Sequence, residues 1–138
     1  MLKTVKHQYL AILWSIIILV LCNMPMSGER NIPLFEGFDK IVHLGFFFVL
    51  TVLLFFGKIK QQLNYSYRVK TIIKIFFITT LLGGGIELLQ LKVFTYRGAE
   101  WFDFFADLTG SAMGIFSYIL LHNHKFNETI MCRTHKPT

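Results

Sequence analysis

The chain has 138 residues, of which 54% are hydrophobic and 16% aromatic, and its formal net charge is +6. It is too short for two soluble domains and too apolar for an ordinary soluble domain. A positive charge can indicate nucleic-acid binding. No basic stretch here is interleaved with stacking aromatic residues, however, so we expect no nucleic-acid partner.

Four apolar segments follow one another along the chain, and each approaches the roughly 20 residues that a helix needs to cross a bilayer. None presents the polar face expected of a helix on a soluble domain. The first could also be a signal peptide, but no small-x-small cleavage pattern follows it. We therefore predict an all-α membrane protein, a single domain over residues 1–138 folded as a four-helix transmembrane bundle. The predicted helices cover residues 9–24, 41–57, 72–91 and 104–121, followed by a short tail at 122–138.

The basic residues are distributed unevenly between the connections. Ten of the fourteen Lys and Arg residues lie in the N-terminal segment, the second connection and the C-terminal tail. Basic residues favour the cytoplasmic side of a membrane. We therefore expect both termini, including the tail, to be cytoplasmic and the first and third connections to lie outside.

Polar residues cluster at the edges of three apolar segments. His43 follows Asp39 by four residues and Asp107 follows Asp103 by four, so each pair shares one helix face. Glu87 lies near the end of the third segment, where a charge at bilayer depth costs roughly 2.5–3.5 kcal/mol and usually has a partner. Since antiparallel helices bring these ends together, we predict one polar site at the extracytoplasmic ends of helices 2–4. Its expected binding residues are Asp39, Lys40, His43, Glu87, Gln90, Arg97, Asp103 and Asp107.

Several of these residues also have a purely structural interpretation. Asp39 and Asp103 stand where N-caps are expected, and each could simply satisfy the free amides at a helix start. Arg97 could pair with Glu87 or Asp107 and fix the third connection. His43 could be a hydrogen-bonded packing residue as readily as a ligand or base. Gln90 is expected to form an interhelical hydrogen bond.

The small residues in the third and fourth segments predict close helix contacts. Gly83 opens the run Gly83-Gly-Gly85, and Gly110 and Gly114 share one helix stripe. Glycine at such positions lets two helix backbones approach each other. We therefore interpret Gly83, Gly110 and Gly114 as packing residues. The excess of acid over base nearby would also suit a divalent cation, but the spacing follows no dedicated metal motif, so we assign neither a metal nor a cofactor.

The same residues resemble the VanZ-like family of small bacterial membrane proteins. The similarity runs through Asp39-Lys40-Ile-Val-His43-Leu-Gly-Phe, Ile86-Glu87-Leu-Leu-Gln90, Arg97 and Asp103-Phe-Phe-Ala-Asp107-Leu-Thr-Gly110-Ser-Ala-Met-Gly114. In one departure, the family usually has Asn where this chain has Asp107. The resemblance implies a multi-pass protein of the bacterial inner membrane, associated with the envelope and with an effect on susceptibility to the glycopeptide teicoplanin. It supplies no reaction.

Two functions follow as hypotheses. In the first, the protein is not an enzyme, and the polar site binds a lipid headgroup, a lipid-linked envelope precursor or a partner, or only braces the helix ends. In the second, it is a small intramembrane enzyme acting on a lipid-linked or cell-wall substrate, with His43, Glu87 and Asp103 as candidate catalytic residues. We favour the first, because the sequence shows neither a nucleophile–base pair nor a phosphate-binding loop. The bilayer itself is an expected partner in both, and the sequence leaves the oligomeric state open.

Overall fold

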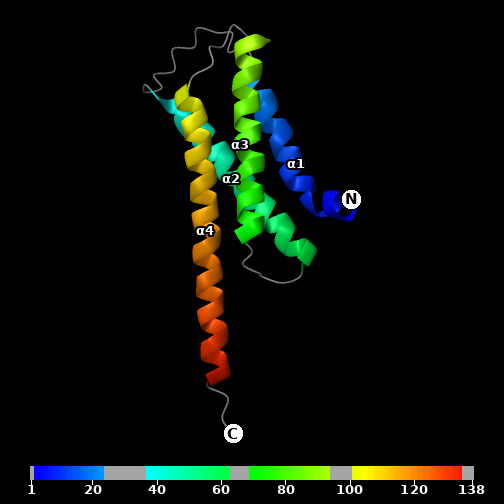
Figure 1. The fold of residues 1–138 in the computed structure, drawn as a ribbon, viewed down its shortest axis with the longest axis vertical. Coiled ribbons are helices and arrows are strands. Elements are labelled where there is room, and N and C mark those ends of the chain that lie inside the picture. Colours follow the sequence, from blue (N-terminus) through cyan, green and yellow to red (C-terminus); the bar gives the residue numbers. More distant parts are fainter. Residues whose placement is uncertain (1, 24–36, 63–68, 94–100, 135–138) are drawn as a thin grey trace.

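Four helices make up the described part of the chain. The computed structural model describes residues 2–23, 37–62, 69–93 and 101–134. These form α1 (Leu2–Asn23), α2 (Phe38–Gln62), α3 (Val69–Lys92) and α4 (Trp101–Thr134). The end of α1, the start of α2, the end of α3 and the start of α4 lie at the same end of the bundle (Figure 1). The all-α, four-helix architecture predicted from the sequence is confirmed.

The helices extend beyond the apolar segments that predicted them. The largest difference is in α4, which has 34 residues and ends at Thr134. The predicted membrane span, which ends at residue 121, agrees with the apolar window Trp101–Leu121, and the helix itself continues beyond it into the segment predicted as a tail. Residues 122–134 are polar but contain no Gly or Pro, so hydropathy falls there while nothing breaks the backbone hydrogen bonding. The last turns of α4 extend past the other helices (Figure 1).

The outer surface of the bundle is apolar. Each helix contains a span long and apolar enough to cross a membrane, and no more than 33% of any span is buried inside the protein. Large side chains such as Phe77 and Leu81 are 61% and 59% exposed. A surface of this kind is unfavourable in water and suits hydrocarbon. The chain is therefore a multi-pass membrane protein.

Helix α2 is the centre of the bundle, and it packs against each of the other three helices. Its closest approach to α4 is at glycine. A Cβ atom at Gly110 would overlap the backbone carbonyl of Leu44, and one at Gly114 would lie 2.8 Å from Cβ of Thr51. The predicted packing role of these two glycines therefore has a direct geometric basis.

Side chains of α1 attach that helix to another face of α2. Gln8 Nε2 donates a hydrogen bond to the carbonyl of Leu54 (3.2 Å), and Trp14 Nε1 donates to the carbonyl of Phe46 (3.1 Å). The Trp14 ring also meets the Phe46 ring edge to face, with centroids 6.0 Å apart. These contacts fix the rotation of α1, and hence which of its residues face the interior.

Substitution of Gly110 by Ala tests the close contact between α2 and α4. Because the added methyl group meets the Leu44 backbone, which cannot rotate away, we expect a loss of roughly 1–3 kcal/mol of stability. Thermal unfolding in detergent micelles measures it. Gly45→Ala is the matched control, because a Cβ at Gly45 meets nothing within 4 Å. Equal unfolding temperatures for the two variants would contradict this packing.

Candidate functional site

A buried hydrogen bond between α2 and α4 forms the centre of the polar site. His43 Nδ1 lies 3.0 Å from Asp107 Oδ1, and the two side chains are 1% and 2% exposed. Neutral imidazole donates through one ring nitrogen and accepts through the other. When Nδ1–H donates to the carboxylate, Nε2 is left as an acceptor that points away from Asp107.

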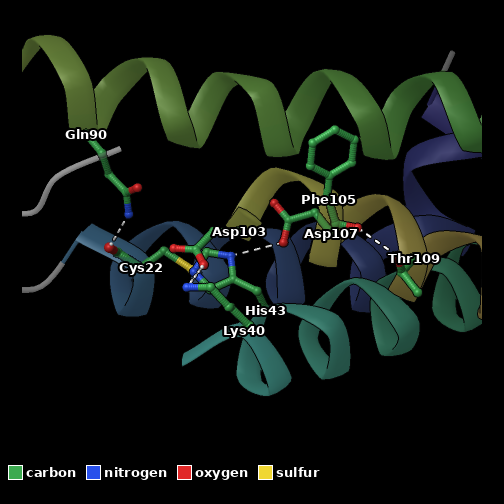
Figure 2. Close-up of polar contacts among 8 residues, drawn as sticks. All are labelled: Cys22, Lys40, His43, Gln90, Asp103, Phe105, Asp107 and Thr109. Atoms are coloured by element: carbon green, nitrogen blue, oxygen red, sulfur yellow. Dashed lines mark hydrogen bonds and ion pairs between the residues drawn. The ribbon is translucent and has the colours of Figure 1, made fainter. Parts of the chain in front are cut away.

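The acceptor nitrogen of His43 faces a residue of α1. Cys22 Sγ lies 3.9 Å from His43 Nε2, and Cys22 is 2% exposed. Figure 2 shows His43 between Cys22 and Asp107, so that a thiol, an imidazole and a carboxyl group from three helices follow one another. Cys22 is not among the residues that the sequence predicts for this site.

The backbone at Cys22 is held by the third helix. Gln90 Nε2 donates a hydrogen bond of 2.8 Å to the Cys22 carbonyl, and Gln90 is 1% exposed. Helix α1 ends at Asn23, so this carbonyl is one of the terminal groups that have no partner within the helix. Gln90 therefore forms the expected interhelical bond and at the same time caps the end of α1.

An ion pair lies one turn nearer the membrane surface. Lys40 Nζ is 3.3 Å from Asp103 Oδ1, and the side chains are 36% and 6% exposed. The Lys40 ammonium also lies 6.0 Å from the centroid of the Phe102 ring. Lys40 is therefore held at the boundary of the site, where it remains partly accessible, while Asp103 is buried beneath it.

Asp39 is the second residue of α2 and Asp103 the third residue of α4, so neither occupies the N-cap position itself. The carbonyl of Gly37 accepts the amides of Lys40 and Ile41, and Gly37 has the positive φ of 95° that favours glycine. Asp39 and Asp103 lie inside the first turns of their helices. There their negative charges interact favourably with the positive end of the helix dipole. Asp103 also pairs with Lys40.

The remaining predicted residues also lie at this end of the bundle, with one exception. Ligand atoms of His43, Glu87 and Asp107 lie within 4.8 Å of one another, as do those of Asp39, His43 and Asp103. His43 belongs to both groups and its Nδ1 already bonds Asp107, so we assign no metal site. Arg97 lies outside the described residues, and its predicted pairing with Glu87 or Asp107 stays a prediction.

Gly83 makes room for the buried carboxyl group. A Cβ atom at this position of α3 would lie 2.8 Å from Asp107 Oδ2. Oδ2 is itself buried and forms no hydrogen bond within the described residues. Gly83 thus has a packing role, as predicted, but the group that it makes room for is a carboxyl group of α4. Hydropathy alone does not reveal this. The rest of its run is different, since a Cβ at Gly85 would meet nothing within 4 Å.

No family model, curated protein or solved structure matches this chain. The interpretation of the site therefore depends on its own residues and geometry, and the resemblance to the VanZ-like family stays a prediction.

A double-mutant cycle tests the buried pair. His43→Leu and Asp107→Leu should each be destabilising, because each leaves a buried polar partner without its hydrogen bond. The double variant should lose less stability than the two single changes added together, with a coupling of roughly 1–3 kcal/mol. Unfolding in detergent micelles measures all four proteins. Strict additivity would show that the two side chains do not interact.

Proposed function

We propose that this chain is a VanZ-like protein of the bacterial inner membrane that binds the phosphate-bearing headgroup of a lipid or of a lipid-linked envelope precursor. One observation carries the proposal. A cluster of paired polar side chains lies at one end of a bundle with an apolar outer surface, and Lys40 stands at the edge of that cluster.

Lys40 supplies the positive charge that a phosphate group would bind in this proposal. Asp103 holds the ammonium in place, and more than a third of the Lys40 side chain remains exposed. Lysine binds phosphate as a compact positive charge. A headgroup arriving at this membrane boundary therefore meets a positioned cation, with the buried His43–Asp107 pair behind it bracing α2 against α4.

The location of the site follows from the distribution of basic residues. We propose that both termini are cytoplasmic and that the site is extracytoplasmic, where envelope precursors are used. The resemblance to the VanZ-like family supports an effect on teicoplanin susceptibility, and the match at Asp39, Lys40, His43, Glu87 and Asp103 supports a role for this end of the bundle.

Thiol labelling tests the orientation. An impermeant maleimide should modify Cys132 only after the cells are opened, since the C-terminus is proposed to be cytoplasmic. Cys22 should stay unmodified throughout, because it is 2% exposed. Cys132→Ala is the control for the site of labelling. Modification of Cys132 in intact cells would place the polar site on the cytoplasmic face.

Removal of the Lys40 charge tests headgroup binding. Lys40→Met should release most of the phospholipid or lipid-linked precursor that co-purifies with the tagged protein and should abolish any effect on teicoplanin susceptibility. Lys40→Arg should retain both, because the positive charge is kept. Phosphate analysis and mass spectrometry of the bound lipid distinguish the two headgroup sources.

Lys92→Met is the matched control for Lys40→Met. It removes the same charge from an exposed position in the last turn of α3, at the same end of the bundle, and should leave lipid retention and susceptibility unchanged. Membrane abundance is measured for every variant. If Lys40→Met loses the phenotype only in step with its abundance, or retains as much lipid as Lys92→Met, the headgroup proposal is wrong.

A further inference from the structure

The arrangement of Cys22, His43 and Asp107 is a feature that headgroup binding does not explain. The thiol sulfur lies 3.9 Å from Nε2 of His43, and Nδ1 of the same ring lies 3.0 Å from Asp107 (Figure 2). A nucleophile next to a base, with the base oriented by a third group, is the geometry of covalent acyl transfer. Such hydrogen bonds are often long before substrate binds and shorten in the complex.

The surroundings of the three side chains favour a lasting covalent product. Cys22, His43 and Asp107 are each 2% exposed or less. Gln90 holds the Cys22 backbone, and the second carboxyl oxygen of Asp107 is a buried acceptor without a hydrogen bond in the described part of the chain. A site that excludes water slows hydrolysis of a reactive intermediate.

An apolar groove lies nearer the middle of the bundle than these residues. Its volume is about 330 Å³, and residues of α1, α2 and α3 line it, among them Ser15 and Leu50. Ser15 lies about two helical turns before Cys22, and Leu50 about two turns after His43, so the groove lies on the same faces of α1 and α2, roughly 10 Å further along them. Two further lining residues, Ile78 and Leu81, are 42% and 59% exposed. The groove therefore opens on the surface that faces lipid.

We propose that Cys22 accepts an acyl chain from a membrane phospholipid as a thioester, with His43 as the base and Asp107 as the residue that positions it. The chain lies in the groove, because only hydrocarbon faces its opening, and the ester carbonyl lies beside the thiol. This inference rests on the proposed lipid-binding function and adds a covalent step to it.

The step balances without an additional oxidant or reductant. His43 Nε2 takes the proton from the Cys22 thiol, and the sulfur attacks the ester carbonyl carbon. The new S–C bond forms as the C–O bond to the glycerol oxygen breaks, and His43 returns the proton to that oxygen. The products are a thioester on Cys22 and a lysophospholipid.

Transfer from a labelled lipid tests the proposal on the full chain. The purified protein is reconstituted into vesicles of phosphatidylglycerol whose acyl chains carry a terminal alkyne, and the labelled protein is detected after azide coupling. The label should be removed by neutral hydroxylamine, which cleaves thioesters, and peptide mass spectrometry should place it on Cys22.

The variants separate the chemistry from folding. Cys22→Ala should lose the label, whereas Cys132→Ala, the matched control at the other cysteine, should keep it. His43→Gln should lower the labelling rate on the order of 10²-fold, as loss of a general base does. Asp107→Asn retains an oxygen that accepts the hydrogen bond from His43 Nδ1–H, so it should keep at least a tenth of the labelling rate. Asp107→Leu has no such oxygen, so its labelling rate should fall as far as that of His43→Gln.

Three results would overturn the inference: no label on the wild-type chain, a label that resists hydroxylamine, or a label on Cys132 instead of Cys22. If the Cys22→Ala variant does not accumulate in the membrane, peptide mapping of the labelled wild-type chain shows whether the acyl group is on Cys22. The two proposals also fail differently. If the thioester forms but lipid retention does not depend on Lys40, only the headgroup proposal is wrong. If lipid retention depends on Lys40 but no thioester forms, only the acyl-transfer proposal is wrong.

Discussion

The hydrogen bond between His43 and Asp107 is the constraint on which the rest of this structure depends. Both side chains are almost completely buried, so neither can be satisfied by water, and a buried polar group without a partner is costly. Each is therefore satisfied by the other, and this restricts the relative rotation of α2 and α4. The two helices consequently meet along the stripe that contains Asp107, Gly110 and Gly114, and many of the large apolar side chains face outward.

The other polar contacts follow from that arrangement. Once Nδ1 of His43 is occupied by Asp107, Nε2 points to α1 and meets Cys22. The end of α1 is then close enough to α3 for Gln90 to bond its carbonyl. Lys40 and Asp103 each lie one turn before His43 and Asp107 on the same two helices, so they pair as well. Two contacts therefore join α2 to α4: the buried His43–Asp107 hydrogen bond and the partly exposed Lys40–Asp103 ion pair. The first fixes the interior of the site, and the second forms its accessible edge.

Helical periodicity and topology predicted much of this site, because His43 follows Lys40 by three residues and Asp107 follows Asp103 by four, on helices that must run antiparallel. The place of Cys22 could not be predicted in this way. A cysteine among apolar residues has no distinctive pattern, and its approach to His43 depends on how Gln8 and Trp14 set the rotation of α1. Hydropathy likewise marks where lipid contact ends rather than where a helix ends, which is why the predicted span stops at residue 121 while α4 continues to Thr134.

The central claim is that the His43 ring is locked between Asp107 and Cys22 inside the membrane. Solid-state NMR of the protein in lipid vesicles, with ¹⁵N-labelled histidine and ¹³C-labelled aspartate, tests it most directly, and His43→Gln identifies the signal among the five histidines. The structure predicts one ring nitrogen that is close to an Asp carboxyl carbon and whose proton exchanges slowly with deuterated buffer. A His43 ring that exchanges rapidly and shows no contact with Asp107 would contradict this account.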